Sequence, residues 1–315
     1  KAQLALFEPG GAPRAPVLER RLPTRGSASL EAVVHAFLNG APRRPTRLVF
    51  GIAGPVEANR CATTNLPWEV DGAAMSAEFG APVTLLNDLE ATAWGLGTLA
   101  PADLHVLHPG VAAPGNRALI AAGTGLGESI LFHHGGRWHP SPSEGGHADF
   151  APRAPLEDEL LVWLRGRYGR VSYERVLSGP GLADLHRFLR ATGRGDEPAA
   201  FARRFDQADD PAAAVGEAAL DGSCGRARLA VETFASVYGA EAGNLALKAL
   251  ALGGVYVGGG IAPHLLPALA AGGCVRAFLD KGRLSPLLAR MPVSVVLDPK
   301  TAVWGAAAFA LHDRS

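Results

Sequence analysis

A glycine-rich turn is the first candidate for chemistry in this sequence. Residues Ala122-Gly123-Thr124-Gly125-Leu126-Gly127 stand between two apolar segments that alternate like strands. Glycines let backbone amides crowd around an anion, and a threonine adds a hydroxyl donor, so the turn could bind phosphate. It is neither a Walker loop, because no Gly-Lys-Ser/Thr follows, nor a dinucleotide fingerprint, because a strand comes next. A tight hairpin turn without a ligand remains the alternative interpretation.

A second glycine cluster, Gly258-Gly259-Gly260, follows the predicted strand Val255–Val257 and precedes the predicted helix Pro263–Leu269. A strand, a glycine turn and a helix N-terminus in this order favour an anion and allow a flat ring to lie on bare backbone. Two such turns in one chain suggest a nucleotide. Close packing of helix on strand would account for the same glycines without any ligand.

A polar pair, Asn87 and Asp88, comes at the carboxyl end of an apolar segment. Open α/β sheets place ligand-binding groups at this end of their strands, and a carboxylate there could take a proton from a hydroxyl group. The alternative is structural, because Asn87 followed by Glu90 is also typical of a helix N-terminus.

A third constellation combines Glu144-Gly145-Gly146-His147 with Glu174. Carboxylate and imidazole groups together accept and donate hydrogen bonds, as the binding of a polyol requires. His133, His134 and His139 lie near in sequence and raise the question of a metal, but neither a HExxH motif nor a Cys/His ligand spacing is present. We therefore predict no protein metal site, and surface polarity is the remaining alternative.

The elements that must position these residues alternate between strand and helix, which predicts an α/β protein. We predict a first hairpin at 2–7 and 17–22, strands at 47–52 and 83–86, and helices at 29–38, 71–79 and from Asn87 to about Leu99. The loop 100–114 is the predicted boundary. After it we predict a hairpin at 118–122 and 129–133, mainly helix over 155–252 with a polar interruption at 193–211, a strand at 293–297 and a helix at 302–311.

Composition excludes several classes of protein. The 315 residues contain 30 basic and 30 acidic side chains, so nothing favours nucleic acid or anionic lipid as a partner. The three cysteines have neither disulfide-framework nor zinc-ligand spacing, which makes the cytoplasm the expected compartment. Residues 249–275 lack charge but contain seven glycines and two prolines, so we do not expect a membrane span.

Taken in order, these segments closely resemble the bacterial glucokinase family over nearly the whole chain. The resemblance is carried by seven stretches: Leu48-Val49-Phe50-Gly51-Ile52-Ala53-Gly54-Pro55-Val56, Thr64-Asn65-Leu66-Pro67-Trp68, Leu86-Asn87-Asp88-Leu89-Glu90-Ala91, Ala121-Ala122-Gly123-Thr124-Gly125-Leu126-Gly127, Ser143-Glu144-Gly145-Gly146-His147, Tyr173-Glu174-Arg175-Val176-Leu177-Ser178-Gly179-Pro180-Gly181 and Gly258-Gly259-Gly260-Ile261-Ala262. Each stretch alone is weak evidence, but the ordered set is specific. The absence of a Cys-rich zinc cluster separates it from the related ROK sugar kinases.

The resemblance implies two ribonuclease-H-like domains of the actin-like ATPase group, flanking a cleft that holds sugar and ATP. We expect a small domain of residues 1–98 and 298–315 and a large domain of residues 99–297. By the family pattern Asp88 is the general base toward the sugar 6-hydroxyl. The further positions that the resemblance assigns to glucose are Asn65, Asn87, Glu144, His147 and Glu174, and those that it assigns to the nucleotide are Gly123, Thr124, Gly125, Gly127, Gly258, Gly259, Gly260 and Ile261.

The implied reaction is Mg²⁺-dependent phosphorylation of glucose by ATP, in a cytoplasmic homodimer. The family also carries an Asp-x-Gly-Gly-Thr loop for phosphate and magnesium, and residue 1 stands where that loop would just have ended. We expect the native chain to carry it before Lys1. The alternatives are a glucose-binding sensor without phosphotransfer, a kinase that also uses mannose or other hexoses, a purely structural homodimer, and a phosphoryl donor other than ATP, such as ADP or polyphosphate.

Overall fold

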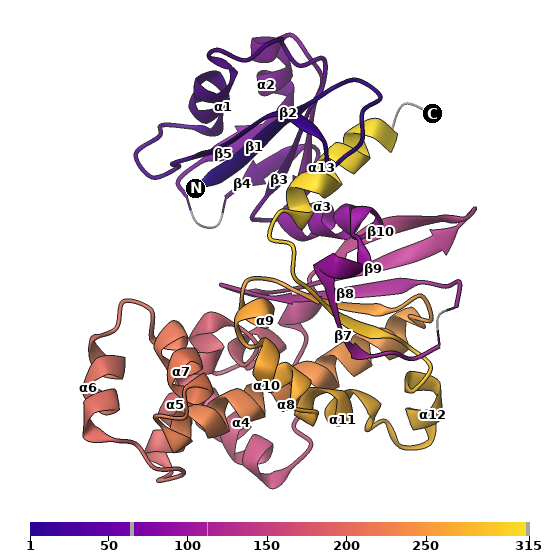
Figure 1. Cartoon of the computed structure of the whole chain (residues 1–315). Coiled ribbons are helices and arrows are strands. Elements are labelled where there is room, and N and C mark those ends of the chain that lie inside the picture. The colour runs from indigo at the N-terminus through magenta and orange to yellow at the C-terminus, as the bar shows by residue number, and fades with distance from the viewer. Residues whose placement is uncertain (64–65, 112, 313–315) are drawn as a thin grey trace. The chain divides into compact units, whose positions relative to one another are not determined.

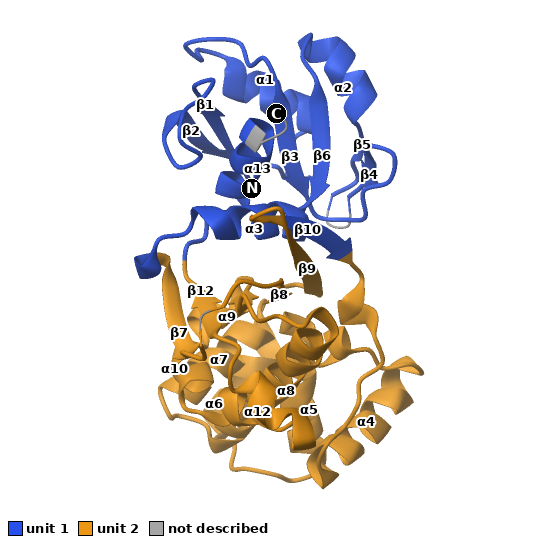
Figure 2. Ribbon diagram, turned by 90° about the vertical axis from the view of Figure 1, so that its right-hand side faces the viewer, with its two compact units in different colours: residues 1–102, 139–142, 298–315 blue, residues 103–138, 143–297 orange. Residues whose placement is uncertain are grey.

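The computed structural model describes residues 1–63, 66–111 and 113–312 (Figure 1). The chain divides into two compact units (Figure 2). Unit 1 comprises residues 1–102, 139–142 and 298–315, and unit 2 comprises residues 103–138 and 143–297. The domain bounds expected from the sequence, 1–98 with 298–315 and 99–297, stay a prediction.

Unit 1 combines short strand pairs with four helices. Its elements are β1 (Ala2–Phe7), β2 (Pro16–Leu22), α1 (Leu30–Leu38), β3 (Leu48–Ile52), β4 (Arg60–Ala62), β5 (Glu69–Asp71), α2 (Gly72–Phe79), β6 (Val83–Asn87), α3 (Asp88–Gly95), a 3₁₀ turn (Leu96–Thr98) and α13 (Thr301–His312). The predicted first hairpin is confirmed, because β1 and β2 pair antiparallel. The predicted strands at 47–52 and 83–86 are also confirmed, and they pair in parallel as β3 and β6.

Unit 2 contains a six-stranded sheet in the order β10-β9-β8-β11-β12-β7, with helices packed around it. Residues 139–142 of β10 are grouped with unit 1. The strands are β7 (Leu104–His108), β8 (Arg117–Ala122), β9 (Leu126–His134), β10 (Arg137–Ser143), β11 (Val255–Gly258) and β12 (Val293–Val296). The helices are α4 (Pro155–Tyr168), α5 (Gly179–Ala191), α6 (Ala199–Gln207), α7 (Pro211–Leu220), α8 (Gly225–Ala249), α9 (Ile261–His264), α10 (Leu266–Ala270), α11 (Gly273–Leu279) and α12 (Ser285–Leu288), with 3₁₀ turns at 101–103, 145–147, 173–175 and 282–284.

Besides missing strand β10, the sequence prediction was wrong at three places in unit 2. The loop expected at 100–114 contains strand β7, which pairs antiparallel with β12. The polar interruption at 193–211 contains α6, whose Phe201 and Phe205 are buried one helical turn apart. The helix expected at 263–269 starts earlier and is divided into α9 and α10, because Pro267 has no amide hydrogen with which to continue a helix from α9.

Helix α8 is the centre of the core of unit 2. Sixteen of its 25 residues are buried, which is typical of a helix surrounded by protein. It approaches α11 closely at two glycines one turn apart: a Cβ on Gly239 would lie 1.9 Å from the carbonyl oxygen of Cys274, and one on Gly243 would lie 2.8 Å from that of Phe278. Among the described residues no helix, α8 included, is long and apolar enough to cross a bilayer.

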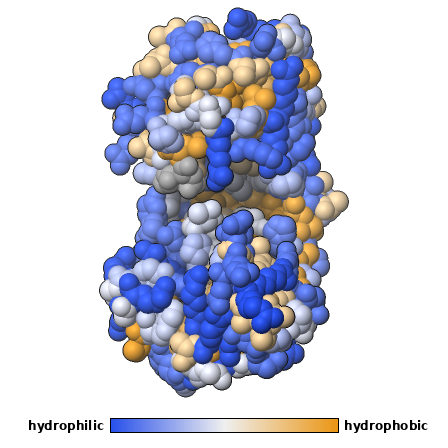
Figure 3. Space-filling model, turned by 90° about the vertical axis from the view of Figure 1, so that its left-hand side faces the viewer, coloured by the Kyte–Doolittle hydropathy of each residue, from blue (hydrophilic) through white to orange (hydrophobic). Residues whose placement is uncertain are grey.

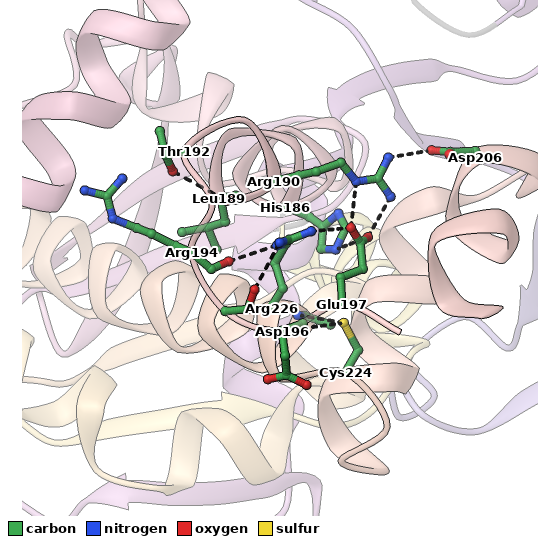
Figure 4. Close-up of polar contacts among 12 residues, drawn as sticks. His186, Leu189, Arg190, Thr192, Arg194, Asp196, Glu197, Asp206, Cys224 and Arg226 are labelled. Carbon is green, nitrogen blue, oxygen red and sulfur yellow. Dashed lines mark hydrogen bonds and ion pairs between the residues drawn. The ribbon is translucent and has the colours of Figure 1, made fainter. Parts of the chain in front are cut away.

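A buried charge network fixes the loop between α5 and α6 (Figure 4). Arg190 donates two hydrogen bonds, of 2.9 and 2.6 Å, to the carboxylate of Glu197, and Arg226 donates to the same carboxylate. His186 is fully buried with its Nε2 atom 3.2 Å from Glu197. Burial lowers the pKa of His186 to about 4, so this imidazole is neutral at pH 7.

The outer surface is mainly polar. On the face seen in Figure 3 hydrophilic residues predominate, with apolar residues scattered among them. Exposed large apolar side chains such as Val17, Val106 and Val162 belong to different elements. Scattered apolar side chains of this kind are usual on a protein surface.

Packing of α13 against α3 positions the helix that begins at Asp88, and it depends on two glycines. A Cβ on Gly305 of α13 would lie 1.7 Å from the carbonyl oxygen of Ala91 and 2.5 Å from the amide nitrogen of Gly95. A Cβ on Gly95 of α3 would in turn lie 2.1 Å from the carbonyl oxygen of Thr301. The two helix backbones are therefore in direct contact.

We expect Gly305→Ala to lower the free energy of unfolding by more than about 2 kcal/mol, because the added methyl group meets rigid backbone. The matched control is Gly166→Ala in α4, where the added Cβ meets no atom within 4 Å. That variant should gain about 0.5–1 kcal/mol from helix propensity. Urea denaturation of both variants checks the prediction, and a Gly305→Ala variant as stable as the parent would contradict the described contact.

Candidate functional site

Asn87 and Asp88 lie where strand β6 passes into helix α3 of unit 1. Asn87 is the N-cap residue: its Oδ1 atom accepts from the amide of Leu89 at 2.9 Å, and its Nδ2 atom donates to the carbonyl oxygen of Gly54 at 2.9 Å. Glu90 accepts a hydrogen bond from the Asn87 amide, which completes a capping box. The interpretation of Asn87 and Glu90 as the N-terminal cap of a helix is therefore confirmed.

Asp88 is exposed at the first position of α3. Its Oδ1 atom also accepts from the Leu89 amide, at 2.8 Å, which orients the carboxylate at the positive end of the helix. An exposed carboxylate at a strand end can accept a proton from a hydroxyl group brought to it. Asn65, the other sugar position assigned by resemblance in this part of the chain, lies outside the described residues.

In unit 2 the structure brings together Glu144, His147 and Glu174. His147 lies between the two carboxylates, with Nε2 3.8 Å from Glu144 and Nδ1 3.9 Å from Glu174. The side chains of Glu144 and His147 are 73% and 54% exposed, whereas that of Glu174 is 28% exposed. Three side chains that can donate and accept hydrogen bonds therefore converge on an accessible patch that could bind a polyol.

Glu174 also connects this patch to the glycine turn between β8 and β9. Its Oε2 atom accepts a hydrogen bond of 3.0 Å from the amide of Leu126. A Cβ on Gly125 would lie 2.4 Å from the same oxygen, so a larger residue there would displace the carboxylate of Glu174. The phosphate-binding candidate and the polyol-binding candidate are consequently parts of one connected site.

The two glycine turns lie side by side at the carboxyl ends of parallel strands. Strand β11 pairs with β8, with Gly258 opposite Ala121. Gly259, at a positive φ of 80°, approaches so closely that a Cβ would lie 2.2 Å from the carbonyl oxygen of Ala122. Parallel α/β sheets bind ligands at this edge.

The glycines of these turns fall into two groups. At Gly125 and Gly259 an added Cβ would meet protein atoms, as described above. Gly123 and Gly260 would bring a Cβ within 4 Å of no described atom. The backbone at this second pair is therefore open enough for a ligand to approach it. Thr124, beside Gly123, is exposed; Gly127 pairs with Ala121 in the hairpin, and Ile261 is the first residue of α9.

A buried tyrosine that the sequence analysis did not identify holds the two turns together. The hydroxyl of Tyr238 in α8 accepts from the amide of Ala122 at 2.9 Å and lies 3.2 Å from the carbonyl oxygen of Gly258, to which it can donate. Burial raises the pKa of Tyr238, so the phenol stays neutral and keeps its proton for this hydrogen bond. In the sequence Tyr238 lies inside a long helical pattern, which does not indicate that its hydroxyl contacts the two turns.

Comparison with known proteins agrees with this geometry. The family model described as Glucokinase matches residues 1–313. A glucokinase from Synechocystis sp. is 44% identical over 290 residues, which cover 87% of this chain and 82% of that protein.

Solved structures confirm the predicted α/β fold of the two-domain actin-like type. A glucokinase from an Antarctic psychrotroph matches with a TM-score of 0.82 and 29% identity over 95% of this chain and 90% of that one. A ROK family glucokinase from Streptomyces griseus, solved with glucose and AMPPNP, matches with a TM-score of 0.63 and 21% identity, covering 98% of this chain and 95% of that one. With the family model spanning nearly every residue, the chain belongs to the glucokinase family.

Proposed function

We propose that this protein transfers the γ-phosphoryl group of ATP to the 6-hydroxyl of D-glucose, giving glucose 6-phosphate and ADP for glycolysis. Membership of the glucokinase family supports the reaction. The observation that carries the assignment of the site is the hydrogen bond between Glu174 and Leu126, which joins the polyol-binding patch to the glycine turn.

We propose Glu144, His147 and Glu174 as the residues that bind the ring hydroxyls of glucose, with Asn87 and Asn65 as further sugar contacts. The two carboxylates accept hydrogen bonds from hydroxyl groups, and the imidazole can donate or accept. Asn87 is already committed to Leu89 and Gly54, so its amide could offer a sugar only its remaining hydrogen-bonding capacity. Selectivity should follow, since a sugar that lacks one hydroxyl would leave a polar group unpaired.

We assign the nucleotide to the two adjacent glycine turns. The residues Gly123, Thr124, Gly125 and Gly127 would contact phosphate, and Gly258, Gly259, Gly260 and Ile261 would contact adenosine. The open backbone at Gly123 and Gly260 and the exposed hydroxyl of Thr124 support this assignment. The similar Streptomyces griseus protein was solved with AMPPNP, which supports a nucleoside triphosphate as donor rather than polyphosphate.

Asp88 is our proposed general base. In a loose phosphoryl-transfer transition state the nucleophile needs little activation, so the carboxylate has to orient the 6-hydroxyl and receive its proton late. The hydrogen bond from Leu89 orients the carboxylate of Asp88 at the start of α3. The 6-hydroxyl oxygen bonds to the γ-phosphorus as the bond to the β,γ-bridging oxygen breaks, the hydroxyl proton passes to Asp88, and ADP leaves.

Mg²⁺ is expected to accompany ATP and to neutralise charge on its phosphates. Across the described ranges, no group of three or more His, Cys, Asp or Glu side chains could hold a metal ion. We derive no step through the metal. Mg²⁺ commonly relies on phosphates, water and only one or two carboxylates.

A cavity in unit 1 supports a place for the Asp-x-Gly-Gly-Thr loop expected from the resemblance. Within the described part of the chain, β1 pairs only with β2, and β3 only with β6. Strands β1 and β3, with α1 and α13, line a cavity of about 430 Å³. We propose that a strand from a segment before Lys1 fills this cavity, completes the sheet between β1 and β3, and delivers the loop with its carboxylate.

The other expectations remain proposals. We propose a cytoplasmic homodimer, and we keep a kinase of broader hexose specificity and a glucose-binding sensor as alternatives. Turnover separates the sensor from the kinase, since ADP release that requires both glucose and Mg-ATP occurs only in the kinase.

The first test combines that assay with Asp88→Ala. We expect the parent protein, with its native upstream segment, to release ADP, and the variant to lose about 10²- to 10⁴-fold in kcat with a much smaller change in the KM for glucose. Asp158→Asn, at an exposed aspartate in the first turn of α4, is the control and should match the parent. Turnover of Asp88→Ala within about threefold of the parent would remove Asp88 from this role.

The second test concerns sugar selection. We expect Glu174→Gln to raise the KM for glucose by about tenfold or more and to change the ranking of glucose, mannose and fructose, because glutamine keeps an acceptor for the Leu126 amide but loses the carboxylate charge. Glu159→Gln, at an exposed residue paired with Arg194, is the control. An unchanged ranking with unchanged affinities would defeat the assignment of Glu174.

The third test concerns the cavity between β1 and β3. A chain extended before Lys1 by an apolar strand and an Asp-x-Gly-Gly-Thr loop should unfold at a higher temperature than residues 1–315 alone, and its activity should require the loop aspartate. The physical reason is that the new strand buries apolar surface and pairs two free strand edges. Equal unfolding temperatures for the two chains would show that the cavity does not receive this strand.

A further inference from the structure

Two acidic residues that contact no proposed ligand are buried together in unit 2. Glu128 of strand β9 is 1% exposed, and Glu241 of helix α8 is completely buried. The Oε1 atom of each carboxyl group accepts no hydrogen bond from an N–H or hydroxyl group of the described residues. Buried acidic side chains are rare without partners, so this pair needs an explanation.

Two negative charges cannot be accommodated at this place. Burial, followed by the negative charge of Glu241, raises the pKa of Glu128 to about 8, and a side-chain hydrogen bond between the two groups acts in the same direction. Glu241 keeps partners suited to a carboxylate: the Nδ2 atom of Asn244 donates to it at 2.8 Å, and the Nζ atom of Lys248 lies 3.7 Å away. At neutral pH Glu128 therefore keeps its proton.

The other titratable and charged groups around the pair come from several elements. Lys248 ends α8, and Lys281 follows α11 and donates to Asn244 at 2.7 Å. Burial raises the pKa values of Tyr173 and Tyr238, so both phenols stay neutral in the range where Glu128 titrates. Arg153 precedes α4 and is bonded to Glu157. Its positive charge partly offsets the rise in the pKa of Tyr173. Burial, followed by the same charge, lowers the pKa of Lys281.

The carboxyl group of Glu128 supports the backbone of the sugar-binding segment. A Cβ on Gly145 would lie 2.2 Å from the Oε2 atom of Glu128, and one on Gly146 would lie 2.0 Å from the carbonyl oxygen of Leu126. The two glycines between Glu144 and His147 thus lie directly on the start of β9. A change in the charge or hydration of Glu128 would act on this backbone at contact distance.

The segment that carries Glu174 is connected to the same network of hydrogen bonds. Asn244 donates a hydrogen bond of 3.1 Å to the hydroxyl of Tyr173, the residue before Glu174, as well as the bond to Glu241. One chain of contacts therefore runs from Glu128 through Glu241 and Asn244 to Tyr173. Both segments that present sugar-binding side chains are attached to its ends.

We propose that Glu128 is a positioning residue for glucose binding, whose neutral carboxyl group donates a hydrogen bond to Glu241 and so holds the Glu144–His147 segment in its binding shape. This inference rests on the proposed role of that segment. When Glu128 loses its proton, the shared hydrogen bond is replaced by repulsion between two buried carboxylates. The Gly145 backbone is displaced, and the affinity for glucose falls.

The test follows KM and kcat from about pH 6.5 to about pH 9.5 for the parent and for Glu128→Gln. We expect the KM of the parent for glucose to rise about threefold or more above pH 8, with a smaller change in kcat. Glutamine is isosteric and still donates to Glu241, but it does not titrate, so Glu128→Gln should keep the parent KM at pH 7 and lose the alkaline rise. Glu232→Gln is the matched control, because Glu232 is exposed on the same helix, paired with Arg228, and should leave the parent profile unchanged.

A second measurement does not depend on glucose. The raised pKa means that the folded parent binds more protons than the unfolded chain between its ordinary pKa of about 4.5 and about 8, so folding stability falls as pH rises through this window. The unfolding temperature of Glu128→Gln relative to the parent should therefore increase by about 2–4 °C between pH 6 and pH 9.

The outcomes are distinguishable. A parent KM that is flat to pH 9.5, or an alkaline rise that persists in Glu128→Gln, overturns the positioning role even if the temperature shift is found. The parent profile alone decides this if the variant fails to fold. A parent that shows no glucose-dependent ADP release at any pH overturns the proposed function, and this inference with it.

Discussion

The hydrogen bonding of the Tyr238 hydroxyl is the interaction on which our proposed nucleotide site depends. This hydroxyl bonds to the ends of two strands that are parallel neighbours, β8 at Ala122 and β11 at Gly258. Each of these strands passes at once into a glycine turn, so a single buried hydroxyl fixes the spacing of both turns. Helix α8 can bring the phenol there because Gly239, the next residue, allows the opposite side of the helix to touch the backbone of α11. The same part of α8 therefore provides both the close packing against α11 and the hydroxyl that fixes the spacing of the two glycine turns.

The sequence predicted the hairpins and the central strands because their periodicity is local. It missed β10 because Pro140 and Pro142 argue against a strand, and the structure resolves the conflict by placing β10 at the sheet edge. It missed β7 because this strand exists through pairing with β12, nearly two hundred residues later, and no local pattern reports such a partner. Sequence patterns are weakest where distant pairing decides the structure.

The residue types of the candidate site were predictable from the sequence. Which of these residues make close protein contacts and which leave the backbone open was not. Glycine in a turn suggested a ligand, and the structure shows that an added Cβ at Gly125, Gly145, Gly146 or Gly259 would also meet a protein atom at close range. At Gly123 and Gly260 an added Cβ would meet no described protein atom within 4 Å. The Asn87–Glu90 motif shows the same overlap, because a capping box orients the helix on which Asp88 stands. Structural and functional explanations of one motif are therefore complementary here.

Supporting a loop with a buried carboxyl pair costs folding free energy, because an apolar pair of similar volume would avoid the desolvation of a charge. The acidic pair adds directional hydrogen bonding. A protonated carboxyl group can donate only one hydrogen bond, here toward Glu241, and Asn244 donates hydrogen bonds to both Glu241 and Tyr173. Apolar side chains would fill the same space without specifying which atoms of Gly145 and Tyr173 they support. The side chains of Glu144 and His147 are largely exposed, and the ion pairs described for them, with one another and with Glu174, are 3.8–3.9 Å long, so these side-chain contacts hold them weakly. The order that our proposed sugar site requires would then come from the layer beneath, and we propose the directional network around Glu128 and Glu241 as that layer.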